Sequence, residues 1–157
     1  MELVLRPLMP DDAGDARSCV SAQFAGTRYE ARALEQLDIA LQFDDPEYMA
    51  LLASSGDEIA LRGLVLFGIV AGARGVVKVH VLVGRKLETA VALLEAVWAT
   101  SAHSGERMIV CELPDDTPLI SAADALDASG FIEAGRVPDF VTDGVALRLL
   151  VRTLVVD

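Results

Sequence analysis

The sequence of 157 residues is poor in cysteine and lacks a long apolar segment. Cys19 and Cys111 are its only cysteines, and their wide separation favours buried thiols in a reducing compartment over a disulfide. The longest apolar candidate, Leu61 to Ala73, is interrupted by arginine and glycine and falls short of the roughly 20 residues that a membrane helix requires. The first ten residues lack a signal-peptide layout. We therefore expect a cytoplasmic protein that does not bind a membrane.

Several chemical signatures are also missing from the sequence. No group of His, Cys and Asp residues has metal-ligand spacing, so we expect no metal. The Gly-x-Ser-x-Gly motif and the glycine-rich dinucleotide fingerprint are both absent. These absences argue against a serine hydrolase, a metalloenzyme and a nicotinamide-dependent enzyme.

The charges are unbalanced and unevenly distributed. Thirteen basic residues against 24 acidic ones give a net charge of −11, which repels nucleic acid and favours a cationic partner such as a protonated amine. From Ile59 to Leu87, however, there is no acid, and five bases lie in that stretch: Arg62, Arg74, Lys78, Arg85 and Lys86. The segment is therefore the expected place for an anionic ligand; burial in a sheet would explain the missing acids but not the bases.

The pattern of apolar residues predicts a single α/β domain over residues 1–157. A hydrophobic content of 53% supplies a sizeable core for a chain of this length. We expect a mixed, mostly antiparallel sheet flanked by helices. The predicted strands are 3–7, 64–70, 77–83, 108–111, 131–135 and 145–151, and the predicted helices are 13–24, 34–41, 46–53, 90–104 and 118–129. The stretch from Ile59 to Val70 reads either as one strand with a bulge at Gly68 or as two short strands.

Three motifs occur in an order that resembles the GNAT N-acetyltransferases. The opening Leu5-Arg6-Pro7 with Pro10-Asp11-Asp12-Ala13 resembles their first strand and helix start. The run from Ala128 to Arg136 resembles their helix, Gly-Phe and strand signature, and Asp143-Gly144 resembles the turn of their last hairpin. The resemblance covers nearly the whole chain and implies the GNAT fold, with acetyl-CoA as the acetyl donor.

The resemblance also places a cofactor loop. In that family a loop of pattern Arg/Gln-x-x-Gly-x-Gly/Ala opens a helix whose backbone N–H groups hold the pyrophosphate. The matching segment is Arg85-Lys86-Leu87-Glu88-Thr89-Ala90, in which Arg85 and Ala90 agree with the pattern and Glu88 replaces the central glycine. Glu88 either crowds the phosphates or is an ordinary acid of a first helical turn. The implied cofactor-binding residues are Leu82, Val83, Arg85, Lys86, Leu87, Thr89 and Ala90.

The catalytic residues are less clearly marked. Leu126 stands where the family often has a tyrosine that protonates the departing thiolate, and neither Tyr29 nor Tyr48 matches that position. His80, on the strand before the loop and on the same face as Lys78 and Leu82, is a candidate general base, with a structural histidine as the alternative. Glu112, at the end of the next strand, is the second candidate.

The sequence therefore predicts an N-acetyltransferase that moves an acetyl group from acetyl-CoA to an amine on a small molecule or peptide. Glu88 and Leu126 support the alternative of a non-catalytic binding module or an acyl-CoA sensor. The apolar C-terminal strand pair, from Val145 to Val156, also favours a homodimer.

Overall fold

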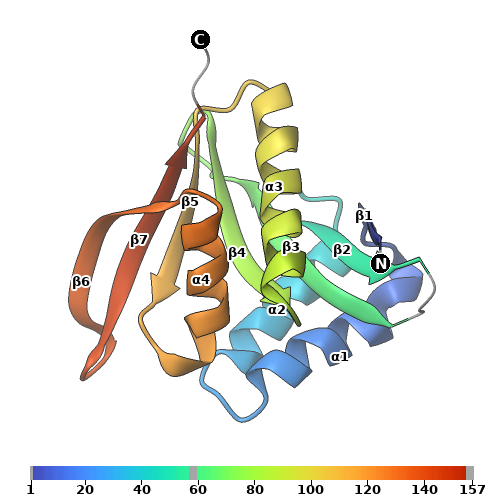
Figure 1. Cartoon of the computed structure of the whole chain (residues 1–157), viewed down its shortest axis with the longest axis horizontal. Coiled ribbons are helices and arrows are strands. Elements are labelled where there is room, and N and C mark those ends of the chain that lie inside the picture. The colour runs from blue at the N-terminus through green and yellow to red at the C-terminus, as the bar shows by residue number, and fades with distance from the viewer. Residues whose placement is uncertain (1, 57–59, 155–157) are drawn as a thin grey trace.

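The computed structural model describes residues 2–56 and 60–154 (Figure 1). The described chain contains four α-helices and seven strands, with two short 3-10 turns at Pro10–Asp12 and Thr117–Leu119. The elements are β1 (Leu3–Pro7), α1 (Ala13–Phe24), α2 (Glu30–Gln42), β2 (Met49–Ser55), β3 (Leu61–Ile69), β4 (Val76–Gly84), α3 (Leu87–His103), β5 (Met108–Pro114), α4 (Ile120–Ala128), β6 (Ile132–Thr142) and β7 (Val145–Thr153).

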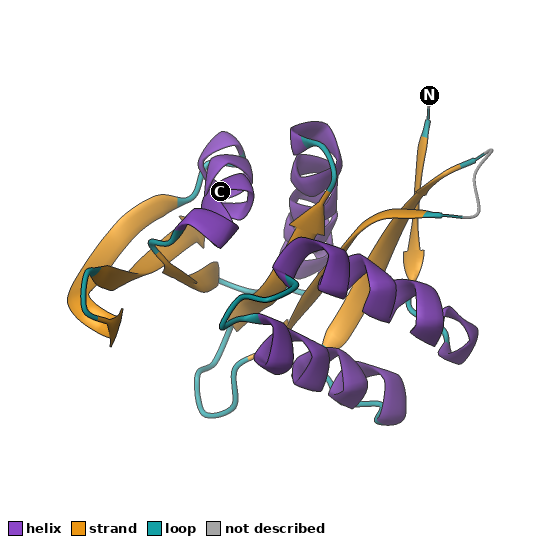
Figure 2. Ribbon diagram, turned by 90° about the horizontal axis from the view of Figure 1, so that it is seen from below, coloured by secondary structure: helices purple, strands orange, loops and turns teal. Residues whose placement is uncertain are grey.

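The strands form one mixed sheet in the order β1-β2-β3-β4-β5-β7-β6. Every neighbouring pair is antiparallel except β4 and β5, which α3 connects as a parallel crossover. Helices α1 and α2 cover one face of the sheet, and α3 and α4 cover the other (Figure 2). The predicted fold class is confirmed: a mixed, mostly antiparallel sheet lies between helices.

The helix predicted over residues 46–53 is wrong, because this stretch forms β2. Met49–Ser55 lies between β1 and β3 and pairs with both. A strand in that position is buried on both faces, so its apolar residues do not alternate with polar ones and resemble a buried helix in sequence. Asp45 forms a turn instead of a helix cap, since its carboxylate accepts a hydrogen bond from the backbone N–H of Glu47 at 2.9 Å.

The loop before β2 crosses β3 at a glycine. A Cβ atom on Gly68 would overlap the backbone carbonyls of Pro46 and Glu47, so only glycine allows the loop to lie this close. The backbone N–H of Ile69 donates to the Pro46 carbonyl at 3.0 Å and fixes the crossing.

The open question about residues 59–70 is also answered: β3 is one continuous strand over Leu61–Ile69, while Ile59 lies outside the described residues.

The sheet opens between β4 and β5. Their parallel pairing covers only Val76, Val77 and Lys78 on β4, although β4 continues to Gly84. Beyond Lys78 no described residue of β4 is paired with β5, so the two strands diverge with unpaired backbone groups along the gap. This gap, and not a loop, creates the hollow at the centre of the molecule.

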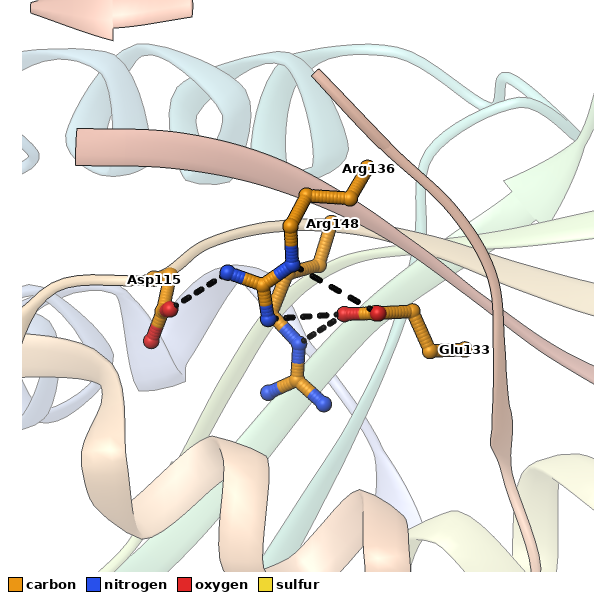
Figure 3. Close-up of polar contacts among 4 residues, drawn as sticks. All are labelled: Asp115, Glu133, Arg136 and Arg148. Carbon is orange, nitrogen blue, oxygen red and sulfur yellow. Dashed lines mark hydrogen bonds and ion pairs between the residues drawn. The ribbon is translucent and has the colours of Figure 1, made fainter. Parts of the chain in front are cut away.

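The C-terminal hairpin extends the sheet past the helices on one side (Figure 2). Strand β6 runs to Thr142, well beyond the predicted end at 135, because it is the outermost strand and an edge tolerates Pro138. Four charged side chains tie the hairpin to the end of β5 (Figure 3). Arg136 pairs with Asp115 at 2.8 Å and with Glu133 at 2.9 Å, and Arg148 pairs with Glu133 at 2.7 Å.

Candidate functional site

A β-bulge at His80 shapes the site. Val81 of β4 pairs with Leu66 of β3, but the next residue of β3, Phe67, pairs with Val79, so His80 is the extra residue. A bulge re-aims the side chain that it carries. Four consecutive residues, Val79 to Leu82, consequently line the gap, and the strict alternation that places His80 on one face with Lys78 and Leu82 does not hold.

The neighbours of His80 favour its neutral ring and one tautomer of that ring. Its Nε2 donates a hydrogen bond to the backbone carbonyl of Glu47 at 2.9 Å, and since a carbonyl only accepts, the neutral ring leaves Nδ1 unprotonated. Tyr48 stacks on the ring with centroids 4.6 Å apart. Burial, together with the nearby charges of Lys78 and Arg32, holds the pKa of His80 below its usual range, although the Glu47 hydrogen bond acts the other way.

Glu112 lies across the gap from β4. Its carboxylate forms an ion pair with the Lys78 ammonium at 3.5 Å, and half of its side chain is exposed. His80 and Glu112 line the same hollow, which we call the α2 cleft. The lining of the α2 cleft comes from α1 and α2, the bulge of β4, the end of β5 and α4: Phe24, Tyr29, Arg32, Ala33, Gln36, Val79, His80, Val81, Leu82, Cys111, Glu112, Leu113, Pro114, Leu119, Ala122 and Leu126.

A second hollow, which we call the α3 cleft, lies at the N-terminus of α3. Arg85, Lys86, Leu87 and Ala90 line it, together with residues of α1 and of the 117–124 segment. The first described hydrogen bond of the helix runs from the N–H of Ala90 to the carbonyl of Lys86, and no side chain caps this end. The amides of the first turn are therefore available as hydrogen-bond donors, and the cations Arg85 and Lys86 line the cleft beside them together with one acid, Asp124.

Two of the implied cofactor-binding residues, Val83 and Thr89, lie outside this cleft, and so does Glu88. Glu88 is exposed and is not part of the lining. The side chain of Thr89 is buried against β3, where its methyl group is 3.1 Å from the position of a Cβ on Gly63. Val83 is buried and lines neither cleft. Leu82, Arg85, Lys86, Leu87 and Ala90 do line the α3 cleft.

The two clefts are neighbours that share part of their walls. Phe24 of α1, Leu82 of β4, and Leu119 and Ala122 of the 117–124 segment line both of them. An elongated ligand with an anionic end at α3 would have to pass these four side chains to reach His80. The gap between β4 and β5 supplies the backbone groups along this path.

Leu126 lies in the α2 cleft and is completely buried, so its position offers no proton. Tyr29, from the turn between α1 and α2, lines the same cleft. Its hydroxyl donates to the Asp116 carboxylate at 2.7 Å. Burial and this carboxylate raise the pKa of Tyr29 to about 12. The phenol thus stays protonated and occupied by Asp116, which makes it a poor proton donor.

The sequence reasoning missed two polar residues of α2 that line the cleft, Arg32 and Gln36. Gln36 is only 8% exposed. The sequence does contain a pattern that indicates Gln36. It lies three residues after Ala33 and four before Ala40, so it is on the apolar face of the predicted helix. A polar residue on a buried helix face indicates a functional role more strongly than a polar residue exposed to solvent does.

Neither a membrane-crossing helix nor a metal site is found in the described chain. Its helices are too short or too polar to span a bilayer. No group of three or more His, Cys, Asp or Glu side chains within residues 2–56 and 60–154 is arranged to hold a metal ion. Both cysteines are buried and unpaired, and burial raises the pKa of Cys111 to about 12.

No protein-family model matches the sequence, and no curated relative matches it. Solved structures do resemble it closely in fold. A Desulfovibrio desulfuricans protein assigned to the GNAT family of acetyltransferases has a TM-score of 0.84 at 18% identity, over 98% of this chain and 100% of that one. The aminoglycoside 6'-N-acetyltransferase of Enterococcus faecium has a TM-score of 0.76 at 15% identity, over 98% of each chain.

A third similar structure contains a bound cofactor. It is a Salmonella typhimurium protein assigned as an acetyltransferase, with acetyl-CoA, and it has a TM-score of 0.74 at 13% identity over 99% of this chain and 95% of that one. The chain therefore has the fold of the GNAT superfamily, as the sequence resemblance implied.

Proposed function

We propose that the protein transfers an acetyl group from acetyl-CoA to an amine. The observation that carries this proposal is that two clefts with four lining residues in common contain the uncapped N-terminus of α3 with two cations in one and the ring of His80 in the other. The α3 cleft fits the pyrophosphate, because Arg85, Lys86 and the first-turn amides of α3 offer positive charge and hydrogen-bond donors. The similar structure with acetyl-CoA supports the same cofactor here.

The proposed chemistry assigns one role to each side chain. Acetyl-CoA supplies the thioester. The Nδ1 atom of His80 removes a proton from the acceptor ammonium, and Glu112 is the second candidate for this role. The amine nitrogen then bonds to the acyl carbon, and the C–S bond breaks with its electron pair leaving on sulfur. Leu126 has no ionisable proton, and the Tyr29 hydroxyl donates its proton to the Asp116 carboxylate in a hydrogen bond. The thiolate therefore takes its proton from solvent or from protonated His80.

The proposal is tested by calorimetric titration with acetyl-CoA, followed by a transfer assay on a panel of primary amines. We expect saturable binding that Arg85→Gln weakens about tenfold, since hydrogen bonds to charged groups contribute about 1.5–3 kcal/mol. Arg17→Gln is the matched control, because Arg17 pairs with Asp38 and lines neither cleft. An absence of binding at millimolar acetyl-CoA would exclude both the transferase and an acyl-CoA sensor.

The same titration resolves the role of Glu88. The exposed carboxylate stands in the first turn of α3 without entering the cleft, so it repels phosphate without crowding it. Glu88→Gln should tighten acetyl-CoA binding a few-fold and cost the helix about 0.3–1 kcal/mol through the lost dipole interaction. If Glu88→Gly tightens binding far more than Glu88→Gln, crowding and not charge is the obstacle.

We also propose that the protein is a homodimer formed through β6. This strand is the edge of the sheet, and Ile132, Val137 and Phe140 on it are 69%, 51% and 64% exposed. Ile132 and Val137 share a face with Val151 and Leu147 of β7, since they are paired directly opposite them. An edge strand that exposes three large apolar side chains is a surface on which a second copy can pair.

A further inference from the structure

The most informative unexplained group in the molecule is the amide of Gln36. The side chain is only 8% exposed and lines the α2 cleft. No described residue hydrogen-bonds to this amide, and its polar atoms are not among the fully enclosed ones, so they are reached from the cleft. An amide that no described residue engages, on a largely buried side chain that lines a cavity, is placed to bind a ligand.

Arg32 lies one helical turn before Gln36 and lines the same cleft. Tyr29, Arg32, Ala33 and Gln36 follow the spacing of one helix face, so the guanidinium and the amide are neighbours along α2. The ion pair of Arg32 with Glu35 is 3.5 Å long, and both side chains are about two-thirds exposed. Such surface pairs contribute little, so a ligand anion can replace Glu35.

The other charges of the cleft leave Arg32 as the cation for a ligand. Glu112, the one carboxylate in the lining, is paired with Lys78. Arg28, which is not in the lining, lies 3.8 Å from Asp116. Arg32 is also near enough to His80 to contribute to the lowering of its pKa. A donor pair on α2 and a basic nitrogen on β4 therefore face one small cavity.

We propose that Arg32 and Gln36 form a carboxylate-binding subsite, so that the acceptor is an amino acid. The guanidinium and the amide NH2 donate to the carboxylate, while the amine of the same molecule lies toward Nδ1 of His80. The net charge of −11 favours cationic acceptors in general, but the local groups of the cleft select a zwitterion. This inference rests on the proposed acetyl transfer only for the role of the amine, not for the binding of the carboxylate.

Matched pairs of compounds test the subsite with and without acetyl-CoA. Binding of the twenty amino acids is measured by calorimetry, with ethylamine, 3-methylbutylamine and phenethylamine as the carboxylate-free partners of alanine, leucine and phenylalanine. Transfer from acetyl-CoA to the same compounds is assayed in parallel. We expect at least one amino acid to bind, and Arg32→Gln to weaken its binding and its kcat/KM by about tenfold or more. Arg17→Gln should change neither.

Gln36→Leu separates ligand binding from folding. Because it replaces an amide that no described residue engages by an apolar side chain of similar size, it should leave the thermal midpoint nearly unchanged, while lowering the affinity for the amino acid. Binding of an amino acid that depends on Arg32 supports the subsite even if acetyl-CoA fails to bind, whereas that failure alone overturns the transferase.

Three results would overturn the carboxylate subsite. The first is that no amino acid binds. The second is that amino acids and their carboxylate-free partners bind and react equally well. The third is that Arg32→Gln weakens binding or transfer only when succinyl-CoA replaces acetyl-CoA. The subsite would then bind a carboxylate on the acyl group and not one on the acceptor.

Discussion

At the scale of single residues, the bulge at His80 decides what the centre of the molecule can do. A regular strand would direct this side chain by simple alternation, whereas the extra residue brings the ring into the cleft and against the Glu47 carbonyl. Burial then keeps the ring neutral near pH 7, because its pKa lies below the ordinary value of about 6.5. A neutral imidazole is ready to accept a proton without first losing one.

The pH dependence of the reaction follows from this shift. Protonation of His80 removes the base, so kcat/KM should fall as the pH drops through the lowered pKa, below the range of an exposed histidine. His80→Gln should abolish this acid limb and reduce the rate about 10²- to 10⁴-fold. His103, the other histidine, lies at the end of α3 and lines neither cleft. His103→Gln should therefore leave the pH profile unchanged; loss of the limb in this variant would refute the assignment.

At the scale of the elements, the crossing of β3 by the loop before β2 supports that histidine. The loop carries the Glu47 carbonyl and the Tyr48 ring that hold His80, and Gly68 lets it lie against the strand. The position of a catalytic candidate on β4 thus depends on a glycine of β3, although the two residues do not share a motif in sequence.

Gly68→Ala should therefore destabilise the protein more than an ordinary glycine substitution. The new methyl group forces the loop away from β3, at a cost of about 1–3 kcal/mol in the free energy of unfolding. Gly135→Ala on β6 is the control, since no atom lies within 4 Å of the added Cβ. Urea denaturation of the two variants measures the difference, and equal midpoints would show that the loop yields without cost.

The sequence was most informative where periodicity was simple. The helices from Ala13 and around Leu93, the meander strand Val76–Gly84 and the final hairpin were all predicted from it. It failed at β2, where burial on both faces removes alternation. It also missed Gln36 and Arg32, because a site formed by separate elements leaves no contiguous motif. It could not show that Glu88 is exposed and outside the lining of the α3 cleft.

At the scale of the whole molecule, the exposed edge of the sheet is the feature that a solution experiment can settle. Phe140 on β6 and Phe43 after α2 are exposed to similar extents, 64% and 60%. If β6 forms the dimer interface, Phe140→Lys should convert the dimer to a monomer in analytical ultracentrifugation, and Phe43→Lys should not. A wild-type chain that sediments as a monomer at tens of micromolar would end the dimer proposal.

The divergence of β4 and β5 has a consequence for how this fold tolerates amino-acid substitutions. A strand presents the same N–H and C=O groups whatever side chains it carries. A groove made by separating two strands is therefore inherited with the architecture and does not depend on particular residues. Proteins that share only 13–18% of their residues with this chain retain its architecture over nearly their whole length. Substitution of a lining side chain such as Leu126 therefore alters the chemistry of the groove and not its course.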